Sequence, residues 1–305
     1  MLVSPLKDTM GKDKDQDREE NIKLNFWGVR GTLPVPGHNT VRYGGNTSCV
    51  SVEFPNDAFF IFDAGTGIKE LSNNLISERS TPVTATIFIS HPHWDHINGL
   101  PFFAPLYEKG NRFKICGPPN KKKSRRKLIS GQMDGIYFPI NIKESYAALS
   151  FCNLGEKTFD INTIDVRTMF LNHPGQCLGY RLCYRNKSIC YITDNEIYPK
   201  SNKHYNEDYV SRLTNFVSDA DALITDCTYT DEEYKEKTGW GHSSVSQVVN
   251  LADRAGVKTL YLFHHDPDQS DNDIDSKLMT AQTILNKKDS STACIAPKDG
   301  ESFNI

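Results

Sequence analysis

Short apolar runs separated by glycine, proline and asparagine dominate the chain from Ile22 onward. In the first third these runs read IKLNFWGV, SCVSVEF and AFFIFDAG, and each is rich in β-branched and aromatic residues. Runs of this kind between turn residues are typical of consecutive strands. The first third of the chain is therefore predicted to be mostly sheet.

A second group of strands is predicted in the middle of the chain. A helical stretch is expected after TATIFIS, and the runs RFKICG, TIDVRTMFL, CLGYRLCYR and KSICYITD that come next are again short and mostly end in polar residues. Because these runs repeat the pattern of the first third, they predict further strands. A second sheet is needed to accommodate them.

The last third alternates strands with helices. After the strand ALITD we expect a helix that is capped by Ser243 or Ser244 and ends at Gly256. One face of this helix carries Val245, Val248, Val249 and Ala252. The strand KTLYLF follows it. This order favours two sheets packed together, with helices covering the outside.

One domain with a loose N-terminal tail is the predicted organisation. Residues 7–21 lack aromatic side chains and, apart from Thr9, β-branched ones, so they cannot bury enough surface to order themselves. The protein has 305 residues, and 38% of them are hydrophobic. This content is enough to form one substantial core, and no pattern requires a division into two domains. We expect a disordered tail over residues 1–21 and a single domain over residues 22–305.

Charge, cysteine content and hydropathy indicate which kinds of partner and which cell compartment are expected. With 35 basic and 38 acidic residues the formal net charge is −3, so no overall field favours a long polyanionic partner. The eight cysteines show no CxxC spacing and no secretory signal precedes them, which predicts reduced thiols in the cytoplasm. The longest apolar runs are far shorter than a membrane span, so no membrane partner is expected.

The stretch SHPHWDH, residues 90–96, crowds three histidines and one aspartate behind the apolar run ATIFI. In an extended segment His91, His93 and Asp95 share one face, and a helix start at Asp95 would turn His96 toward them. Imidazole and carboxylate groups together suit zinc, manganese or iron(II). The alternative is that these side chains only cap the next helix in water. That explanation would suffice for one histidine, whereas four potential ligands in six residues favour a metal site.

HPHWDH matches the HxHxDH signature, and on this ground the chain resembles the metallo-β-lactamase-fold hydrolases. Further signatures of that superfamily follow in order from about Ile22: IFDAGTG with Asp63, LNHPG with His173, YITDNE with Asp194 and LFHHDP with His264. The resemblance implies an α/β protein of the α+β type, a four-layer αββα sandwich with two metal ions at the strand ends along one edge. The stretch from LITD to LFHHDP is most similar to ribonuclease Z and related phosphodiesterases.

The resemblance also implies which side chains hold the two ions. One ion would be bound by His91, His93 and His173, the second by Asp95, His96 and His264, and Asp194 would bridge them. Asp63 would accept a hydrogen bond from a ligand histidine, with a turn before Gly65 as the alternative role. His265 is the alternative to His264, which is preferred because it directly follows TLYLF. Zinc is the expected metal, with manganese and iron as alternatives.

Asp226 and His242 are the pair that points to a substrate class. In the ribonuclease Z-like enzymes an acidic residue and a histidine at these places form a relay beside the scissile phosphate. The acid here is Asp instead of the usual Glu, and its shorter arm puts a direct copy of that relay in question. The alternative is structural, with Asp226 ending a strand and His242 preceding a helix cap. Together with Asp95, the pair forms the predicted catalytic set.

The predicted function is a dinuclear metal-dependent phosphodiesterase in which a bridging hydroxide attacks phosphorus. A small substrate such as a cyclic nucleotide is preferred, because the net charge is slightly acidic and no long RNA-binding arm is visible. One alternative is an RNA endonuclease of the ribonuclease Z type, in which the basic run KKKSRRK, residues 121–127, grips phosphates. The simpler interpretation of this run, and the favoured one, is a solvated loop insertion after CGPPN. A di-iron redox or sensing module is a further alternative, disfavoured because no flavin-binding segment is found. The sequence does not settle the oligomeric state, and a homodimer stays open because proteins of the resembled fold family often dimerise.

Overall fold

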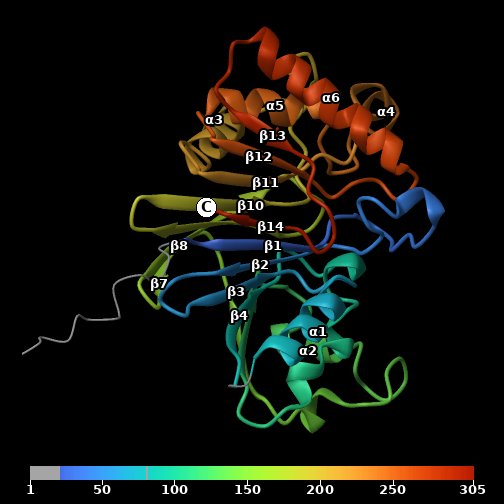
Figure 1. Ribbon diagram of the computed structural model, residues 1–305, viewed down its shortest axis with the longest axis vertical. Helices are drawn as coiled ribbons and strands as arrows, with labels where there is room; N and C mark the ends of the chain where they lie inside the picture. The colour runs from blue at the N-terminus through green and yellow to red at the C-terminus, as the bar shows by residue number, and fades with distance from the viewer. Residues whose placement is uncertain (1–20, 80–81) are drawn as a thin grey trace, which may run out of the picture.

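Two seven-stranded sheets pack face to face in the computed structural model, which describes residues 21–79 and 82–305 (Figure 1). The first sheet, in spatial order, consists of β14 (Ser302–Asn304), β1 (Lys23–Gly28), β2 (Cys49–Glu53), β3 (Phe59–Phe62), β4 (Thr84–Phe88), β5 (Arg112–Gly117) and β6 (Ala148–Asn153). The second consists of β13 (Ala293–Ile295), β12 (Thr259–Phe263), β11 (Ala222–Asp226), β10 (Lys187–Ile192), β9 (Cys177–Tyr184), β8 (Ile164–Leu171) and β7 (Thr158–Ile161). The predicted tail, Asn21 excepted, lies outside the described residues.

Helices cover the outer face of each sheet (Figure 1). Beside the first sheet lie α1 (Ile68–Glu78) and α2 (Arg125–Ser130). Beside the second lie α3 (Glu207–Phe216), α4 (Asp231–Lys237), α5 (Val245–Arg254) and α6 (Asp271–Lys287). The expected αββα sandwich is thereby confirmed. None of the described helices combines the length and the apolar character that crossing a lipid bilayer requires.

Three buried clusters correspond to the three interfaces between these four layers. The inner one joins the two sheets through aromatic side chains, with Phe62 stacked on Tyr191 at 4.9 Å and Phe88 against Tyr180 at 4.7 Å between ring centroids. Buried aromatic rings contribute large apolar areas, so this layer supplies much of the hydrophobic stabilisation. The two outer clusters attach the helices.

The predicted helix after ALITD is confirmed as α5. Ser244 is its N-cap, in a capping box with Gln247, while the Ser243 hydroxyl donates to Asn195 O instead. The predicted apolar face is buried and is extended by Leu251. Gly256 follows the C-cap at φ 65°, which a glycine adopts without strain. Local capping and periodicity therefore suffice to place this helix.

The segment after TATIFIS, where a helical stretch is expected, does not form one continuous helix. It consists of three short 3₁₀ helices, Trp94–His96, Leu100–Phe102 and Ala104–Tyr107. Pro101 and Pro105 lie inside this stretch and lack the backbone N–H that a continuous α-helix needs. The break keeps the ligand-rich segment in a tight turn.

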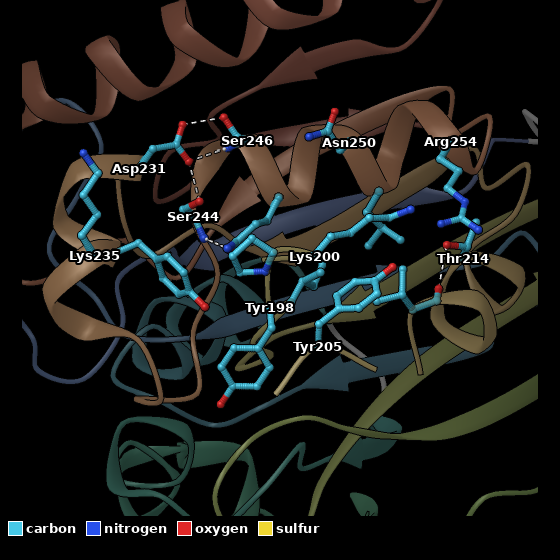
Figure 2. A pocket seen from close by; sticks show the side chains of 16 residues that line it. Tyr198, Lys200, Tyr205, Thr214, Asp231, Lys235, Ser244, Ser246, Asn250 and Arg254 are labelled. Carbon is cyan, nitrogen blue, oxygen red and sulfur yellow. Dashed lines mark hydrogen bonds between the residues drawn. The ribbon is translucent and has the colours of Figure 1, made fainter. Parts of the chain in front are cut away.

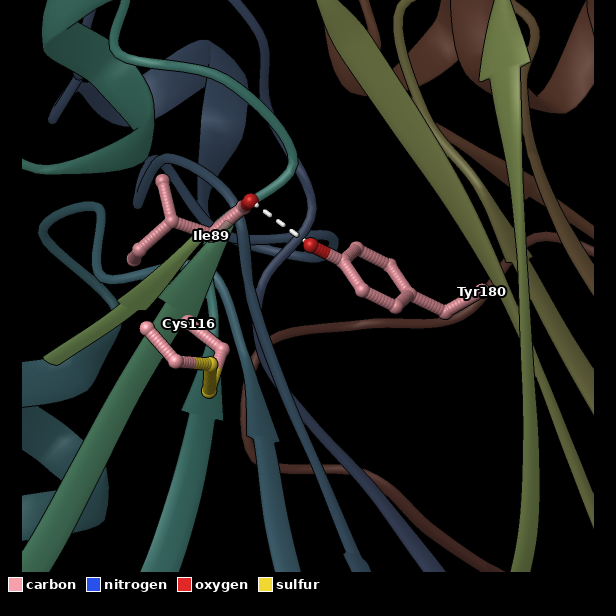
Figure 3. Close-up of a disulfide and its surroundings, with 4 residues drawn as sticks. Ile89, Cys116 and Tyr180 are labelled. Carbon is pink, nitrogen blue, oxygen red and sulfur yellow. Dashed lines mark hydrogen bonds between the residues drawn. A yellow bond between two sulfur atoms is a disulfide. The ribbon is translucent and has the colours of Figure 1, made fainter. Parts of the chain in front are cut away.

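The expectation of reduced thiols throughout is also wrong, because Cys116 and Cys152 form a disulfide (Figure 3). They are direct register partners on the parallel strands β5 and β6, with Cα atoms 4.7 Å apart. Spacing in the sequence carries no information on this register. The other six cysteines are free. Figure 3 also shows Tyr180, whose hydroxyl donates to Ile89 O and ties the second sheet to the strand end that precedes His91.

Candidate metal centre

The candidate ligands gather where strands of both sheets end. β10, β11 and β12 run parallel, so their carboxyl ends meet at one edge, and there lie Asp194, just after β10, Asp226, the last residue of β11, and His264, just after β12. In the first sheet, β3 and β4 are parallel as well and lead to Asp63 and His91. Asp63, Asp194 and His264 have positive φ angles of 57°, 46° and 58°. Strained backbone of this kind at several clustered residues is typical of functional sites.

The first metal cluster consists of His91, His93, His173 and Asp194, whose ligand atoms all lie within 4.8 Å of one another. Asp194 Oδ2 is 3.5 Å from His91 Nε2 and 3.7 Å from His173 Nε2. His173 Nε2 is 3.2 Å from His93 Nδ1. Three imidazoles and one carboxylate converge here, which is a donor set suited to a divalent ion.

The second metal cluster consists of Asp95, His96 and His264, again within 4.8 Å. Asp194 reaches it with its other oxygen, because Oδ1 lies 3.2 Å from His96 Nε2 and 3.1 Å from His264 Nε2. Asp194 thus faces the first cluster with Oδ2 and the second with Oδ1. This is the arrangement that a carboxylate bridging two ions requires.

The structure places His264, and not His265, beside the other candidate ligands. The His265 ring packs against Tyr43, and neither of its ring nitrogens has a hydrogen-bond partner within the described residues. Its backbone pairs with Val29 and Gly31. His264 lies just after the end of β12 at a positive φ of 58°, and in this turn its ring faces the clusters while that of His265 does not.

Neighbouring groups orient four of the candidate ligand rings. His96 Nδ1 donates to Asp63 Oδ2 at 2.8 Å, and His173 Nδ1 donates to Gly241 O at 3.0 Å. The Nδ1 atoms of His91 and His264 lie 3.1 Å from the hydroxyls of Ser90 and Thr228 respectively. Such contacts fix the ring orientation and leave Nε2 to face the clusters.

Asp63 lies behind His96, as the sequence predicts for a carboxylate that orients a ligand. It is fully buried and also accepts hydrogen bonds from the Ser90 hydroxyl and amide and from the Tyr191 hydroxyl. Four donors converge on this carboxylate, so its position is determined by both sheets. The hydrogen-bonded turn that follows starts at Gly65, whose carbonyl accepts from Ile68 N, so Asp63 lies before this turn and not in it.

Two buried histidine nitrogens without hydrogen-bond partners are a further reason to expect metal ions at these clusters. The Nε2 atoms of His91 and His96 are buried and have no hydrogen-bond partner in the described part of the chain. A buried polar atom without a partner costs free energy, which a coordinated ion would offset. Burial lowers the pKa of His91 well below its ordinary value, so this imidazole is neutral and able to coordinate.

Asp194 is negatively charged, in contrast to the neutral imidazole of His91. Burial acts to raise its pKa, but the surrounding His264, His96 and His91 outweigh burial and hold the pKa of Asp194 well below its ordinary value. A buried carboxylate between imidazoles carries the charge needed to attract divalent ions.

Asp226 and His242 form a short ion pair next to both clusters. His242 Nδ1 donates to Asp226 Oδ2 at 2.6 Å, and the His242 ring stacks on the His264 ring with centroids 5.0 Å apart. Asp226 is fully buried and also accepts from Asn195 N and Thr228 N. The shorter arm of Asp is therefore sufficient, because β11 ends at Asp226 itself and carries the carboxylate up to the ring.

The Asp226 carboxylate keeps His242 protonated at neutral pH. Burial acts to lower the pKa of His242, but the charge of Asp226 and its hydrogen bond raise it to about 9. With Nδ1 engaged by Asp226, Nε2 is the nitrogen that can deliver a proton. A protonated imidazole held through Nδ1 has the form that a general acid requires.

Glu196 is a buried residue that the sequence analysis missed. Its carboxylate accepts hydrogen bonds from the Tyr234 hydroxyl, from Gly239 N and from Gly241 N. These contacts fix the loop that carries His242. Gly241 has φ 89°, and a Cβ there would lie 2.5 Å from His173 Nδ1, so only glycine fits. The available signal was an acid two positions after Asp194 in YITDNE.

A cavity of about 560 Å³ lies on α5 and the residues around it (Figure 2). Its lining includes Tyr198, Tyr205, Asn250 and Arg254 but none of the clustered metal-site residues. Figure 2 shows Asp231 hydrogen-bonded to Ser244 and Ser246, which joins the start of α4 to the start of α5. This cavity is separate from the candidate metal centre, and its polar contacts brace the helix that follows His242.

Comparison with known proteins agrees with this geometry. A family described as "Beta-lactamase superfamily domain" matches residues 59–265. Ribonuclease Z of Thermoplasma volcanium is 27% identical over 286 residues, covering 81% of this chain and 88% of that protein. Yeast PDE1 superposes with a TM-score of 0.69 at 14% identity, over 93% of this chain and 99% of that one. The short form of human tRNase Z gives 0.63 at 18% identity, over 92% and 98%. The two structural likenesses show a shared fold.

Proposed function

The chain belongs to the β-lactamase superfamily as a metal-dependent hydrolase, and on that premise we propose that it is a dinuclear phosphodiesterase. The observation that carries the proposal is the Asp226–His242 pair, placed next to the two clusters with His242 stacked on His264. Cleavage of a phosphodiester expels an alkoxide, which is a poor leaving group. A protonated imidazole can give this oxygen a proton as the bond to phosphorus breaks. The ribonuclease Z relatives support the same substrate class.

In the proposed centre one ion would be held by His91, His93 and His173 and the other by Asp95, His96 and His264, with Asp194 shared between them. When bound, two such ions supply an activated water and stabilise negative charge on the phosphoryl oxygens. Nitrogen and carboxylate ligands suit zinc, our first choice, and also manganese and iron.

The chain's own residues perform the remaining steps. Asp63, Ser90, Thr228 and Gly241 hold the ligand rings in place, so that little reorganisation is needed during the reaction. Asp226 keeps His242 charged and oriented, and His242 Nε2 gives its proton to the departing oxygen. Asp95 accepts a hydrogen bond from Thr32 N at 2.8 Å, which fixes its position at the second cluster.

The proposed substrate is small, such as a cyclic nucleotide. The formal net charge of −3 gives no general attraction for a long polyanion. A ribonuclease Z-type endonuclease is the second candidate, favoured by the 27% identity to an archaeal ribonuclease Z. The redox alternative is set aside, since the chain is a hydrolase.

Homodimer formation and a cytoplasmic location stay predictions. The Cys116–Cys152 disulfide is an observation against a reducing compartment, in which such bonds are rare. Light scattering of the purified protein would test the homodimer. Counting free thiols in protein isolated under acid quench would test whether the disulfide forms in the cell.

We expect metal-loaded protein to hydrolyse diesters and to leave β-lactams intact. The site holds a proton donor, His242, that suits an alkoxide leaving group. The opening of a strained lactam ring does not need such a donor. Bis-p-nitrophenyl phosphate, a cyclic nucleotide, precursor transfer RNA, nitrocefin and a thioester should be assayed side by side. Nitrocefin turnover without diesterase activity would overturn the substrate class.

A further inference from the structure

A second cavity, of about 510 Å³, opens directly at the first metal cluster. One part of its lining consists of His91, His93 and the turn 174–176, which follows His173. Another part consists of residues 118–122, which contain two lysines of the basic run. The volume is in the range of small-molecule binding sites. The basic run and the candidate metal centre therefore share one cavity.

The basic run lies in a turn and at the start of α2, and all of its residues except Arg125 are exposed to solvent, in line with its interpretation as a solvated segment. The Asn120 side chain accepts hydrogen bonds from Lys122 N at 2.9 Å and from Lys123 N at 3.0 Å. Ser124 then caps α2 by accepting from Lys127 N. These contacts fix the backbone that carries Lys121 and Lys122, so their positions beside the cluster are defined by the fold.

The charges around this cavity are of one sign. No acidic residue is found among the described residues that line it, and within the described chain neither Lys121 nor Lys122 has a carboxylate partner. Two unpaired ammonium groups beside a candidate phosphodiester site favour an additional anion.

Arg125 adds a second, independent observation. Its side chain is only 3% exposed, and none of its three guanidinium nitrogens has a hydrogen-bond partner within the described residues. It packs at the end of β5, where a Cβ on Gly117 would lie 3.1 Å from Cζ, directly before the cavity residue Pro118. A buried cation without a partner is costly, and an anion bound nearby would offset part of that cost.

We propose that this cavity is an anion subsite in which Lys121 and Lys122 bind a second phosphate group of the substrate, with Arg125 adding positive potential from behind. The inference rests on the proposed phosphodiesterase function and specifies its substrate. The preferred substrate is a phosphodiester that carries another phosphate on the neighbouring unit. That phosphate is either the terminal group of a small nucleotide or the next linkage of an RNA strand.

The test compares matched substrates on the wild-type protein and on the double variant Lys121→Gln, Lys122→Gln. The substrates are the diuridine phosphate UpU, its 5′-phosphorylated and 3′-phosphorylated forms, and a single-stranded RNA oligonucleotide. A terminal phosphate should raise wild-type kcat/KM by roughly 10- to 100-fold, the range expected for charge-assisted hydrogen bonds. The double variant should lose this advantage, so that its kcat/KM for the phosphorylated forms falls to its own value for UpU.

The two sources of the phosphate are separated by the substrate arms. An advantage for a phosphorylated dinucleotide identifies a terminal phosphate, and an advantage for the oligonucleotide alone, with a salt dependence that flattens in the variant, identifies a neighbouring linkage. The control variant Lys203→Gln, Lys287→Gln removes the same charge from exposed positions elsewhere and should behave like wild type. Equal rates for all substrates in wild type, or equal losses in both double variants, would overturn the subsite.

A binding measurement separates this inference from the proposed function. Calorimetry with metal-loaded protein should show tighter binding of phosphorylated diuridine with a non-hydrolysable methylene-phosphonate linkage than of its unphosphorylated form, and the Lys121/Lys122 variant should abolish the difference. Wild-type protein that hydrolyses UpU but binds both ligands equally contradicts the subsite only. Protein that hydrolyses no diester contradicts the proposed function, and the calorimetric difference then still decides whether the anion subsite exists.

Discussion

Replacing Asp194 by alanine is expected to empty both metal positions and to remove nearly all hydrolase activity. Its two carboxylate oxygens face different clusters, with Oδ2 3.5 Å from His91 Nε2 and Oδ1 3.1 Å from His264 Nε2. Loss of this carboxylate leaves buried imidazoles without a shared anion, so each ion loses a ligand and charge compensation. Elemental analysis of the purified variant, together with diester hydrolysis, measures both effects.

His93→Ala is the matching change at one cluster only. It removes a ligand of the first metal position and leaves Asp95, His96 and His264 in place, so we expect activity to fall nearly as far while roughly one ion per chain is retained. Asp160→Ala, at an exposed position on β7, is the control and should keep full metal content and activity. Full activity in either cluster variant would contradict the assignment of these residues as ligands.

His242→Ala is expected to keep both ions and the fold while diester turnover falls by roughly 10²- to 10⁴-fold, the loss typical of a positioned proton donor. The loss should shrink for a p-nitrophenolate leaving group, which needs little protonation, and be largest for a ribose alkoxide. Initial rates on a series of diesters with graded leaving groups, combined with metal analysis, test this. His204→Ala, which alters an exposed histidine, should have no effect.

Asp226→Asn tests whether the pair acts as a unit. The amide is isosteric but cannot hold a charged imidazole, so this variant should show the same dependence on the leaving group as His242→Ala. The double variant should be little slower than either single one. If both single variants keep full rates on every diester, the relay and the main reason for a phosphodiester substrate are lost.

The local part of the site could be predicted from the sequence because its spacing is short. Alternation along SHPHWDH brings His91 and His93 together, and the 3₁₀ turn at Trp94–His96 swings His96 inward as expected. The partners His173, Asp194 and His264 are distant in the chain. They were predicted only through the family resemblance, since no local pattern states which strand ends will adjoin.

The features that escaped prediction depend on register and on tertiary contacts. The Cys116–Cys152 disulfide follows from the pairing of β5 with β6, which no cysteine spacing encodes. Arg125 reads as one cation in a surface run, yet the start of α2 turns it into the protein. Glu196 reads as a strand-end acid, and its role depends on a loop more than 40 residues away. Sequence patterns define faces and ends, whereas packing decides which of them meet.

Titration of metal-free protein with zinc, followed by diester hydrolysis at each step, tests the central claim most directly. The two clusters joined by Asp194 predict that activity on bis-p-nitrophenyl phosphate rises until about two equivalents per chain are bound and then levels off. Activity that is complete at one equivalent, or a fully metal-loaded protein that hydrolyses no diester, would contradict a dinuclear phosphodiesterase.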